Sequence, residues 1–403
     1  MVRALITMIT TSPLLLQAFF IPFLLLSSIL INASSTINII DHGAIGDGKK
    51  DDSQAFVAAW NIACKSSEPT TTIYVPSQKR FLISPISFQG PCNNSKITFQ
   101  MEGTLIAPDY KKMSTSTNYW LMFNGVQGVS IIGGYLDAQG TSLWACKASG
   151  TNCPTGAVSL AFYSSKDILI QNLRSMNAKL FHILVHSSQD AVIQGVRIDA
   201  PGNSPNTDGI HVQNSVNVRV FNVGIRTGDD CISIGPGTRY LLIQNVTCGP
   251  GHGISIGSLG KESKEEGVQN VVVKNVVFNG TQNGLRIKTW GRPSNGFVTT
   301  VLFKQIVMKN VQNPIIIDQN YCPHKTSCPN QSSGIQISGV TYTNIVGTSA
   351  TQVAMKFDCS KTTPCNQISL ESIKLTYKDQ TAKSFCKNVH GTADGVVSPQ
   401  SCV

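Results

Sequence analysis

Four short stretches of this 403-residue chain share one pattern: DGIHV at 208–212, DCISI at 230–234, HGISI at 252–256 and NGLRI at 283–287. In each, two apolar residues flank a single intervening residue, which is the period-two alternation of a half-buried β-strand. Successive copies of this alternation begin 27, 22, 22, 31 and 30 residues apart. The copies start at Ile183, Ile210, Ile232, Ile254, Leu285 and Ile315.

A second strand-like motif recurs between these stretches. It reads apolar-x-apolar-x-(Asn, Gly or Gln)-apolar, and its copies end 23, 27, 23, 30, 30 and 34 residues apart. They end at Leu173, Val196, Val223, Val246, Val276, Ile306 and Val340. One such turn cannot bury its own apolar face, so stacked turns must build the core. We therefore expect an all-β fold, a single-stranded right-handed parallel β-helix (a solenoid), over residues 35–403.

Two other architectures fit the repeat less well. Leucine-rich repeats have a similar period, but their Leu-x-x-Leu-x-Leu pattern is missing. A β-sandwich would not keep one motif in register over six copies. A charged fraction of only 13% also favours short strands and turns over long surface helices.

The amino-terminal end of a β-helix needs a cap, because it exposes strand edges and core. Ser53 is a good helix N-cap, and Asp51 and Asp52 precede it. The apolar residues that follow at helical spacing are Phe56, Val57, Trp60 and Cys64. We expect a short capping helix near 53–65, and the segment after about residue 355 at the opposite end.

The first residues are typical of a signal peptide. Arg3 is the only charge before Asp41, an apolar run follows over 13–31, and small residues come next at 33–35. We assign residues 1–34 to the signal peptide and residues 35–403 to the catalytic domain. An uncleaved membrane anchor is the alternative, but Pro22 and the small polar exit favour cleavage. No later stretch approaches the ~20 apolar residues of a membrane span.

Cysteines, sequons and charge all indicate an extracellular protein that meets polyanions. No zinc-type spacing is present, so local disulfides between sequence neighbours are expected. The net charge of +10 is not arranged as a nucleic-acid motif, which leaves an acidic polysaccharide as the better partner. The neighbouring cysteines are Cys64 and Cys92, Cys146 and Cys153, Cys231 and Cys248, Cys322 and Cys328, Cys359 and Cys365, Cys386 and Cys402. The Asn-x-Ser/Thr sequons begin at Asn93, Asn245, Asn279 and Asn330.

Stacking also places the polar residues of the repeat on one face. If the first apolar residues of the copies form an interior column, the residues after them alternate outward. That face then carries His211, Gln213, Ser233, Gly235, Ser255, Gly257, Arg286 and Lys288. Rungs of a sheet are about 4.8 Å apart. Asp208, Asp230 and His252, each two residues before the column, should therefore form a ladder.

Asp229 lies beside Asp230, although strict alternation would send one of them inward. A turn or bulge at Gly228 could bring both carboxylates out. Taken singly, these residues would be ordinary turn or solvated residues. Three acids in one register are different, because their proximity disfavours ionisation of at least one. Glycoside hydrolysis needs one carboxylic acid to protonate the leaving oxygen and one carboxylate to activate water.

At these residues the sequence resembles the polygalacturonases, the glycoside hydrolases of pectin, and in particular their plant branch. The likeness covers nearly all of the chain after the signal peptide. The matching segments are Asn206-Thr207-Asp208, Gly228-Asp229-Asp230, Gly251-His252-Gly253 and Arg286-Ile287-Lys288, in the family's order, with the wider stretches Gly43–Asp52 and Cys248–Trp290.

The resemblance implies inverting hydrolysis of α-1,4-galacturonosyl linkages in a pectic polysaccharide. It implies Asp229 as the general acid, Asp208 and Asp230 as the groups that activate water, and His252 as the residue that tunes the acid. It also implies a secreted monomer in the cell wall, without metal or cofactor. The substrate-binding residues that it implies are Asn206, Arg286, Lys288 and Tyr321.

Two rival functions remain from the residues themselves. A pectate lyase would use Ca²⁺ held by Asp208, Asp229 and Asp230, but His252 and the complete hydrolase motifs argue against it. A non-catalytic wall-binding protein would need no acid pair. Because a general acid must stay protonated while its partners ionise, we also expect an acidic pH optimum.

Overall fold

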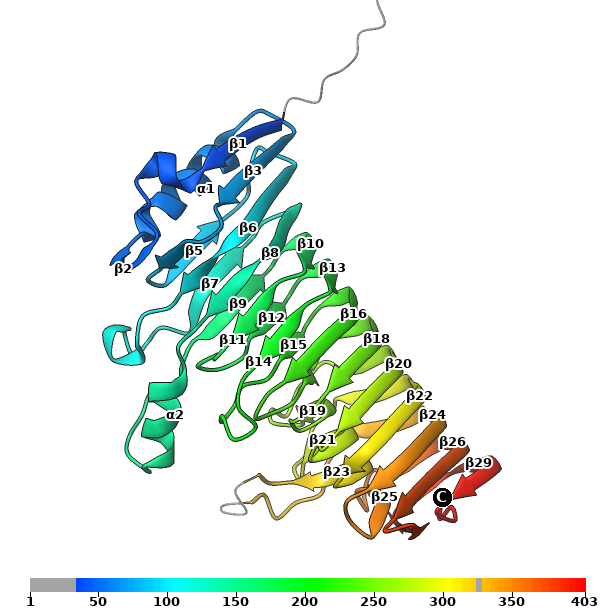
Figure 1. Ribbon diagram of the computed structural model, residues 1–403. Coiled ribbons are helices and arrows are strands. Elements are labelled where there is room, and N and C mark those ends of the chain that lie inside the picture. The colour runs from blue at the N-terminus through cyan, green and yellow to red at the C-terminus, as the bar shows by residue number, and fades with distance from the viewer. Residues whose placement is uncertain (1–33, 324–327) are drawn as a thin grey trace, which may run out of the picture. The chain divides into compact units, whose positions relative to one another are not determined.

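The computed structural model describes residues 34–323 and 328–403, and strands dominate it (Figure 1). The expected signal peptide, except Ser34, lies outside the described residues. Among the described helices, none is long and apolar enough to cross a membrane.

Two long, mainly parallel sheets share the described strands. The eleven-stranded sheet, which we call sheet B, contains β5 (Ile86–Gln89), β7 (Tyr119–Asn124), β9 (Val158–Tyr163), β12 (Ile183–His186), β15 (Ile210–Gln213), β17 (Ile232–Ile234), β19 (Ile254–Leu259), β21 (Asn283–Trp290), β23 (Asn313–Tyr321), β25 (Val353–Asp358) and β28 (Lys383–Lys387).

The eighteen-stranded sheet, sheet A, supplies the other sides of each turn. It contains β1 (Ser34–Asn38), β2 (Asp47–Asp51), β3 (Thr70–Val75), β4 (Arg80–Leu82), β6 (Lys96–Ile106), β8 (Val129–Asp137), β10 (Lys166–Gln171), β11 (Arg174–Met176), β13 (Gln189–Gln194), β14 (Arg197–Asp199), β16 (Val216–Arg226), β18 (Arg239–Cys248), β20 (Val268–Asn279), β22 (Phe297–Val311), β24 (Gln336–Ser349), β26 (Cys365–Tyr377), β27 (Gln380–Thr381) and β29 (Val389–Ser398).

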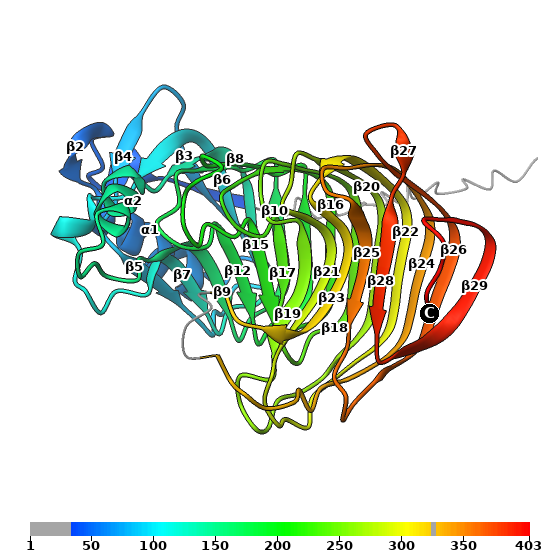
Figure 2. The same ribbon diagram turned by 90° about the horizontal axis from the view of Figure 1, so that it is seen from below.

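The chain alternates between the two sheets, so each turn lays its strands in parallel on those of the previous turn. This is the expected right-handed parallel β-helix, and Figure 2 shows the strands of sheet B following one another in chain order. The register is the one the repeat predicts: Ile210 pairs with Ile232, Ile232 with Ile254, and Ile254 with Leu285. All four side chains are fully buried, which confirms the interior column.

The asparagine of the second motif has a conformational reason. In sheet A, Asn222, Asn245 and Asn275 have φ of 57°, 54° and 54°, a left-handed conformation that asparagine tolerates better than most residues. The side chains form a ladder, with Asn245 Nδ2 donating to Asn222 Oδ1 (3.1 Å) and Asn275 Nδ2 to Asn245 Oδ1 (3.2 Å). The repeated asparagine therefore bends each turn at the same place.

The expected capping helix is present as α1 (Ser53–Lys65), and Trp60 from this helix packs against Phe88, Phe99 and Phe123 of the first turns. The expectation that Ser53 is the N-cap is wrong. The N-cap is Asp52, whose carboxylate instead accepts from the backbone N–H groups of Ile45 and Gly46.

The remaining helices are short. They are η1 (Ile39–His42), η2 (Tyr110–Lys112) and α2 (Thr141–Ala148). All twelve cysteines form disulfides, and the six pairs are the sequence neighbours expected above. Four of these cysteines follow residue 355, where β25, β26, β28 and β29 end the stack.

Candidate active site

The candidate residues stand on sheet B and on the loops that lead into its strands. Asp208 precedes β15, Asp229 and Asp230 precede β17, and His252 precedes β19. The side chains of Asp229 and Asp230 both lie on the polar face, so neither points into the core. The loop of Asp229 and Asp230 passes so close to Ser204 that position 228 has no room for a side chain. A Cβ added at Gly228 would lie 2.1 Å from the Ser204 carbonyl oxygen.

Asp230 is the anchored carboxylate of the site. Its Oδ1 accepts from Arg286 Nη2 (2.6 Å) and from the Ser255 hydroxyl (2.8 Å), and its Oδ2 accepts from Lys288 Nζ (2.8 Å). Its side chain is 1% exposed. Burial alone would raise the pKa of Asp230, but Lys288 and Arg286 outweigh it and lower this pKa to about 2. Asp230 is therefore ionised at any pH where the enzyme could work.

Asp208 is in the opposite electrostatic situation. It is buried, and among the described residues the Ser233 hydroxyl donates a hydrogen bond to its Oδ2 at 2.6 Å. Burial, followed by the charges of Asp229 and Asp230, raises the pKa of Asp208 well above its usual range. The cluster of acids therefore keeps a proton at Asp208 at a pH where isolated carboxyls are ionised.

Asp229 is the most accessible of the three acids, with its side chain 20% exposed. Its Oδ1 lies 3.0 Å from His252 Nδ1 and also accepts the Asp230 backbone N–H at 2.8 Å. The His252 carbonyl in turn accepts from the Asn283 amide at 3.1 Å, which fixes the loop. An added Cβ at Gly253 would lie 2.2 Å from the Asn283 carbonyl oxygen, so this tight approach requires glycine.

Tyr321 lies beside the cationic residues, and Asn206 is set apart. Lys288 Nζ is 5.2 Å from the centre of the Tyr321 ring, and Trp290 packs edge-on against the same ring at 5.5 Å. Asn206 is exposed, with φ 57°, in the loop before β15. Within the described part of the chain its side chain has no hydrogen-bond partner, so no hydrogen bond joins it to the carboxylates.

Two serines of the polar face contact the acids, and one histidine contacts one of these serines, although the motifs gave none of the three a role. Ser255 and Ser233 donate to Asp230 and Asp208, and His211 is hydrogen-bonded to Ser233. Their position in the outward column was visible in the sequence. What the column could not reveal is that the two hydroxyls bond to different carboxylates.

The only cluster with metal-ligand geometry among the described residues is Asp229, Asp230 and His252, whose ligand atoms lie within 4.8 Å of one another. Arg286 and Lys288 already pair with both oxygens of Asp230. A divalent cation would have to bind beside two fixed positive charges, so this donor set does not fit a calcium or zinc site.

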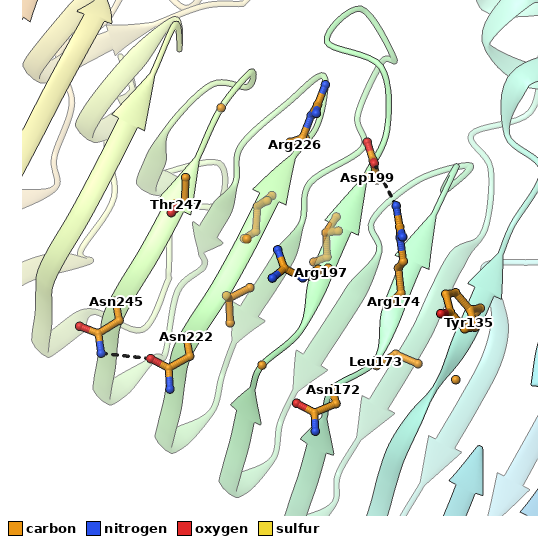
Figure 3. Close-up of a pocket in the computed structure, with 17 residues that line it drawn as sticks. Tyr135, Asn172, Leu173, Arg174, Arg197, Asp199, Asn222, Arg226, Asn245 and Thr247 are labelled. Carbon is orange, nitrogen blue, oxygen red and sulfur yellow. Dashed lines mark hydrogen bonds and ion pairs between the residues drawn. The ribbon is translucent and has the colours of Figure 1, made fainter. Parts of the chain in front are cut away.

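A large groove of about 1010 Å³ lies elsewhere, on the outer surface of sheet A (Figure 3). Arg174, Arg197 and Arg226 border it, and Arg174 pairs with Asp199 at 3.7 Å. None of the candidate active-site residues lines this groove. This groove is therefore separate from the candidate active site.

A carboxyl that keeps its proton, a carboxylate that has lost its own and two adjacent cations, all on a parallel β-helix, are the groups that acid–base cleavage of an acidic carbohydrate needs. The comparisons with known proteins give the family. Residues 64–402 match the model of glycosyl hydrolases family 28. The chain belongs to this family and is a glycoside hydrolase.

Two of its relatives are similar over nearly their whole lengths. It is 55% identical over 383 residues to a polygalacturonase of Prunus persica, covering 94% of this chain and 97% of that protein. It is 41% identical to an exopolygalacturonase of Platanus acerifolia, covering 91% and 98%. Among solved structures, the endo-xylogalacturonan hydrolase of Aspergillus tubingensis superposes with a TM-score of 0.77 at 21% identity, covering 91% and 100%, which shows the shared fold.

Proposed function

We propose that this protein is a polygalacturonase that hydrolyses α-1,4-galacturonosyl linkages of pectin with inversion at the anomeric carbon. The observation that carries the proposal is the unequal ionisation of neighbouring acids: Asp230 is held ionised by two cations, while burial and like charges raise the pKa of Asp208 so that it keeps a proton. The plant relatives named polygalacturonase support the substrate.

In the proposed mechanism the proton held by the cluster of acids passes through Asp229 to the glycosidic oxygen as the bond to the anomeric carbon breaks, which leaves Asp208 ionised. Asp208 and Asp230 hold a water molecule on the other face of the sugar, and Asp208 takes the proton of this water as its oxygen attacks. The exposure of Asp229 and its contact with His252 support its role as the donor. The burial and fixed charge of Asp230 suit a group that orients water.

The acidic sugar is bound by charge in this proposal. Arg286 and Lys288 leave the site with a net positive edge next to Tyr321, which suits the carboxylate of galacturonate. Asn206, exposed at the end of its loop, is proposed as a further contact. The disulfides support export to the cell wall, where we propose that the protein acts as a monomer without cofactor.

The test is an assay of the purified protein on de-esterified polygalacturonate, with EDTA in one arm and added calcium in the other. New reducing ends without unsaturated uronate in both arms are the expected result. Unsaturated product in the calcium arm alone would indicate a lyase. An absence of cleavage in both arms would overturn the proposal and favour a binding protein or a different pectin as substrate.

A further inference from the structure

His211 is connected to the acids but has no part in the mechanism above. Its strand, β15, pairs with β17 so that His211 lies directly beside Ser233. His211 Nδ1 is 2.7 Å from the Ser233 hydroxyl oxygen, which is 2.6 Å from Asp208 Oδ2. The imidazole stacks on Phe181, with ring centres 4.9 Å apart. The ring is thus held in the plane that points Nδ1 at the hydroxyl.

A count of protons sets the direction of these hydrogen bonds. The Ser233 hydroxyl has one proton, and it donates this proton to Asp208. The second hydrogen bond of the same oxygen must therefore be donated by His211 Nδ1. Burial lowers the pKa of His211 to about 4, so above that pH the neutral ring carries its single N–H at Nδ1.

The other ring nitrogen completes the chain. His211 Nε2 lies 3.1 Å from Gln213 Oε1. Because Nε2 is an acceptor in this tautomer, the Gln213 amide must turn by about 180° so that its NH₂ group takes the place of Oε1 and donates to the ring. Gln213, His211 and Ser233 then all donate in one direction, toward Asp208.

We propose that His211 is a positioning residue that acts through Ser233 to favour the ionised form of Asp208, the form that must accept a proton from water in the proposed mechanism. The inference rests on the hydrolytic function proposed above. A carboxylate that accepts a hydrogen bond from a polarised hydroxyl gains more from ionisation than one that does not. Asp229 faces His252 and not such a hydroxyl.

The Ser233 hydroxyl links His211 to Asp208 and carries no charge of its own. Among the described residues, Ser233 Oγ hydrogen-bonds only with Asp208 and His211. Substitutions at Ser233 and His211 therefore change the environment of Asp208 without removing a charge. The titratable and charged groups that face Asp208 and His211 are Asp229, Asp230, Lys288 and His186.

The experiment compares pH profiles of kcat on polygalacturonate for the wild type and four variants. In Ser233→Ala the hydrogen bond to Asp208 is lost, so Asp208 binds a proton more readily and the acidic limb moves up by about 1 pH unit. In His211→Phe the stacking on Phe181 is kept but the donor is lost, so the limb moves the same way by less. The double variant should match Ser233→Ala, since both act along one chain.

A conservative variant separates positioning from packing. In His211→Asn the side-chain amide nitrogen replaces Nδ1 as donor, so its acidic limb should return toward the wild type. The alkaline limb should stay unchanged in all variants. As a matched control, Ser175→Ala removes a buried serine–histidine hydrogen bond, Ser175 to His182 Nδ1 at 2.8 Å, with no carboxylate in it. This control should keep the wild-type profile.

The outcomes separate this inference from the function on which it depends. If the wild type does not cleave polygalacturonate, the proposed function fails first. If the wild type is active but Ser233→Ala and His211→Phe lower kcat equally at every pH, with no movement of the acidic limb, His211 has only a packing role and the inference is overturned. The same follows if His211→Asn behaves like His211→Phe.

Discussion

Three aspartates on one face acquire different properties because each has different partners. Two cations and a hydroxyl surround Asp230, whereas Asp208 is buried with only a hydroxyl and Asp229 faces a histidine at the edge of the site. The same side chain can then serve as a fixed charge, as a base and as an acid. The roles are set by these contacts more than by the residue type.

Replacement of Asp229 by asparagine is the sharpest test of the proposed acid. Asp229→Asn keeps the size of the side chain and an oxygen that can face His252, but it cannot donate a carboxylic proton. We expect kcat to fall by about 10²–10⁴-fold, with thermal stability close to that of the wild type. Reducing-end assays with calorimetry on the same sample measure both. Full activity in this variant would transfer the acid role to another residue.

Lys288 should affect catalysis through Asp230 as well as through substrate binding. In Lys288→Met, Oδ2 of Asp230 loses its 2.8 Å partner, and the pKa of Asp230 rises because one of its two cations is gone. We expect kcat/KM to fall by about 10- to 100-fold. Arg174→Met is the matched control, because Arg174 also pairs with an aspartate but lies in the groove on sheet A. An equal loss in both variants would contradict a specific role.

At this scale the sequence predicted which residues gather but not how they bond. The register alone placed Asp208, Asp230 and His252 on successive rungs, and the structure confirms that register. Hydrogen-bond partners depend on rotamers and loop paths of a few tenths of an ångström, and no repeat pattern encodes those. The pairing of Arg286 with Asp230 could not be predicted for this reason.

At the scale of single elements, the loop before β17 is fastened at both of its ends. Cys231 follows Asp230 directly and is bonded to Cys248 of β18, at a sequence separation of 17. At the other end Gly228 allows the loop to lie against Ser204. The disulfide and this close backbone contact restrict the positions that the carboxylates of Asp229 and Asp230 can occupy.

Removal of that disulfide should therefore cost both stability and turnover. For Cys231→Ser with Cys248→Ser we expect a loss of about 2–4 kcal/mol in the free energy of unfolding, together with a lower kcat. Cys386→Ser with Cys402→Ser is the matched control, because its loop is of similar size, with a sequence separation of 16, at the far end of the stack. We expect comparable destabilisation there and an unchanged kcat well below the melting temperature.

Denaturant unfolding and initial rates at the same temperature distinguish the two variants. If the control lost turnover as much as the Cys231 variant, the loop would have no special part in holding the acids.

Element prediction succeeded where periodicity was strong, as in the interior column. It failed at the start of α1, where Asp52 and not Ser53 is the N-cap. The Asp52 carboxylate accepts from the backbone N–H groups of Ile45 and Gly46, and helical periodicity carries no signal for that contact.

At the scale of the whole molecule, stacking links fold and function. Each turn adds one rung to the core and one set of outward residues to the polar face, so residues 22 or 31 positions apart in sequence become neighbours. A rigid stack can hold like charges together that a softer fold would let separate. Repulsion between the acids of the site should therefore lower the free energy of unfolding of the whole protein, by an amount that depends on pH.

The sign of this dependence follows from the two shifted carboxyls. The pKa of Asp208 is raised above its ordinary value of 3.8, so its stabilising contribution is complete below that value and is lost as pH rises through the raised pKa. The pKa of Asp230 is lowered to about 2, so its contribution is complete above the ordinary value and is lost as pH falls toward 2. Together they place the stability maximum in mild acid.

Asp208→Asn should remove the loss of stability on the neutral side, because the neutral amide resembles the protonated carboxyl. We expect this variant to be inactive, to melt like the wild type in mild acid, and to melt higher than the wild type at neutral pH. Asp230→Asn should do the reverse and melt lower across the whole range, since Arg286 and Lys288 lose their buried partner. Thermal unfolding of the three proteins from mild acid to neutral pH measures this. Parallel curves for the wild type and Asp208→Asn would show that Asp208 carries no electrostatic strain, whereas curves that diverge as pH rises would show that the acid which makes the site reactive also limits the stability of the solenoid.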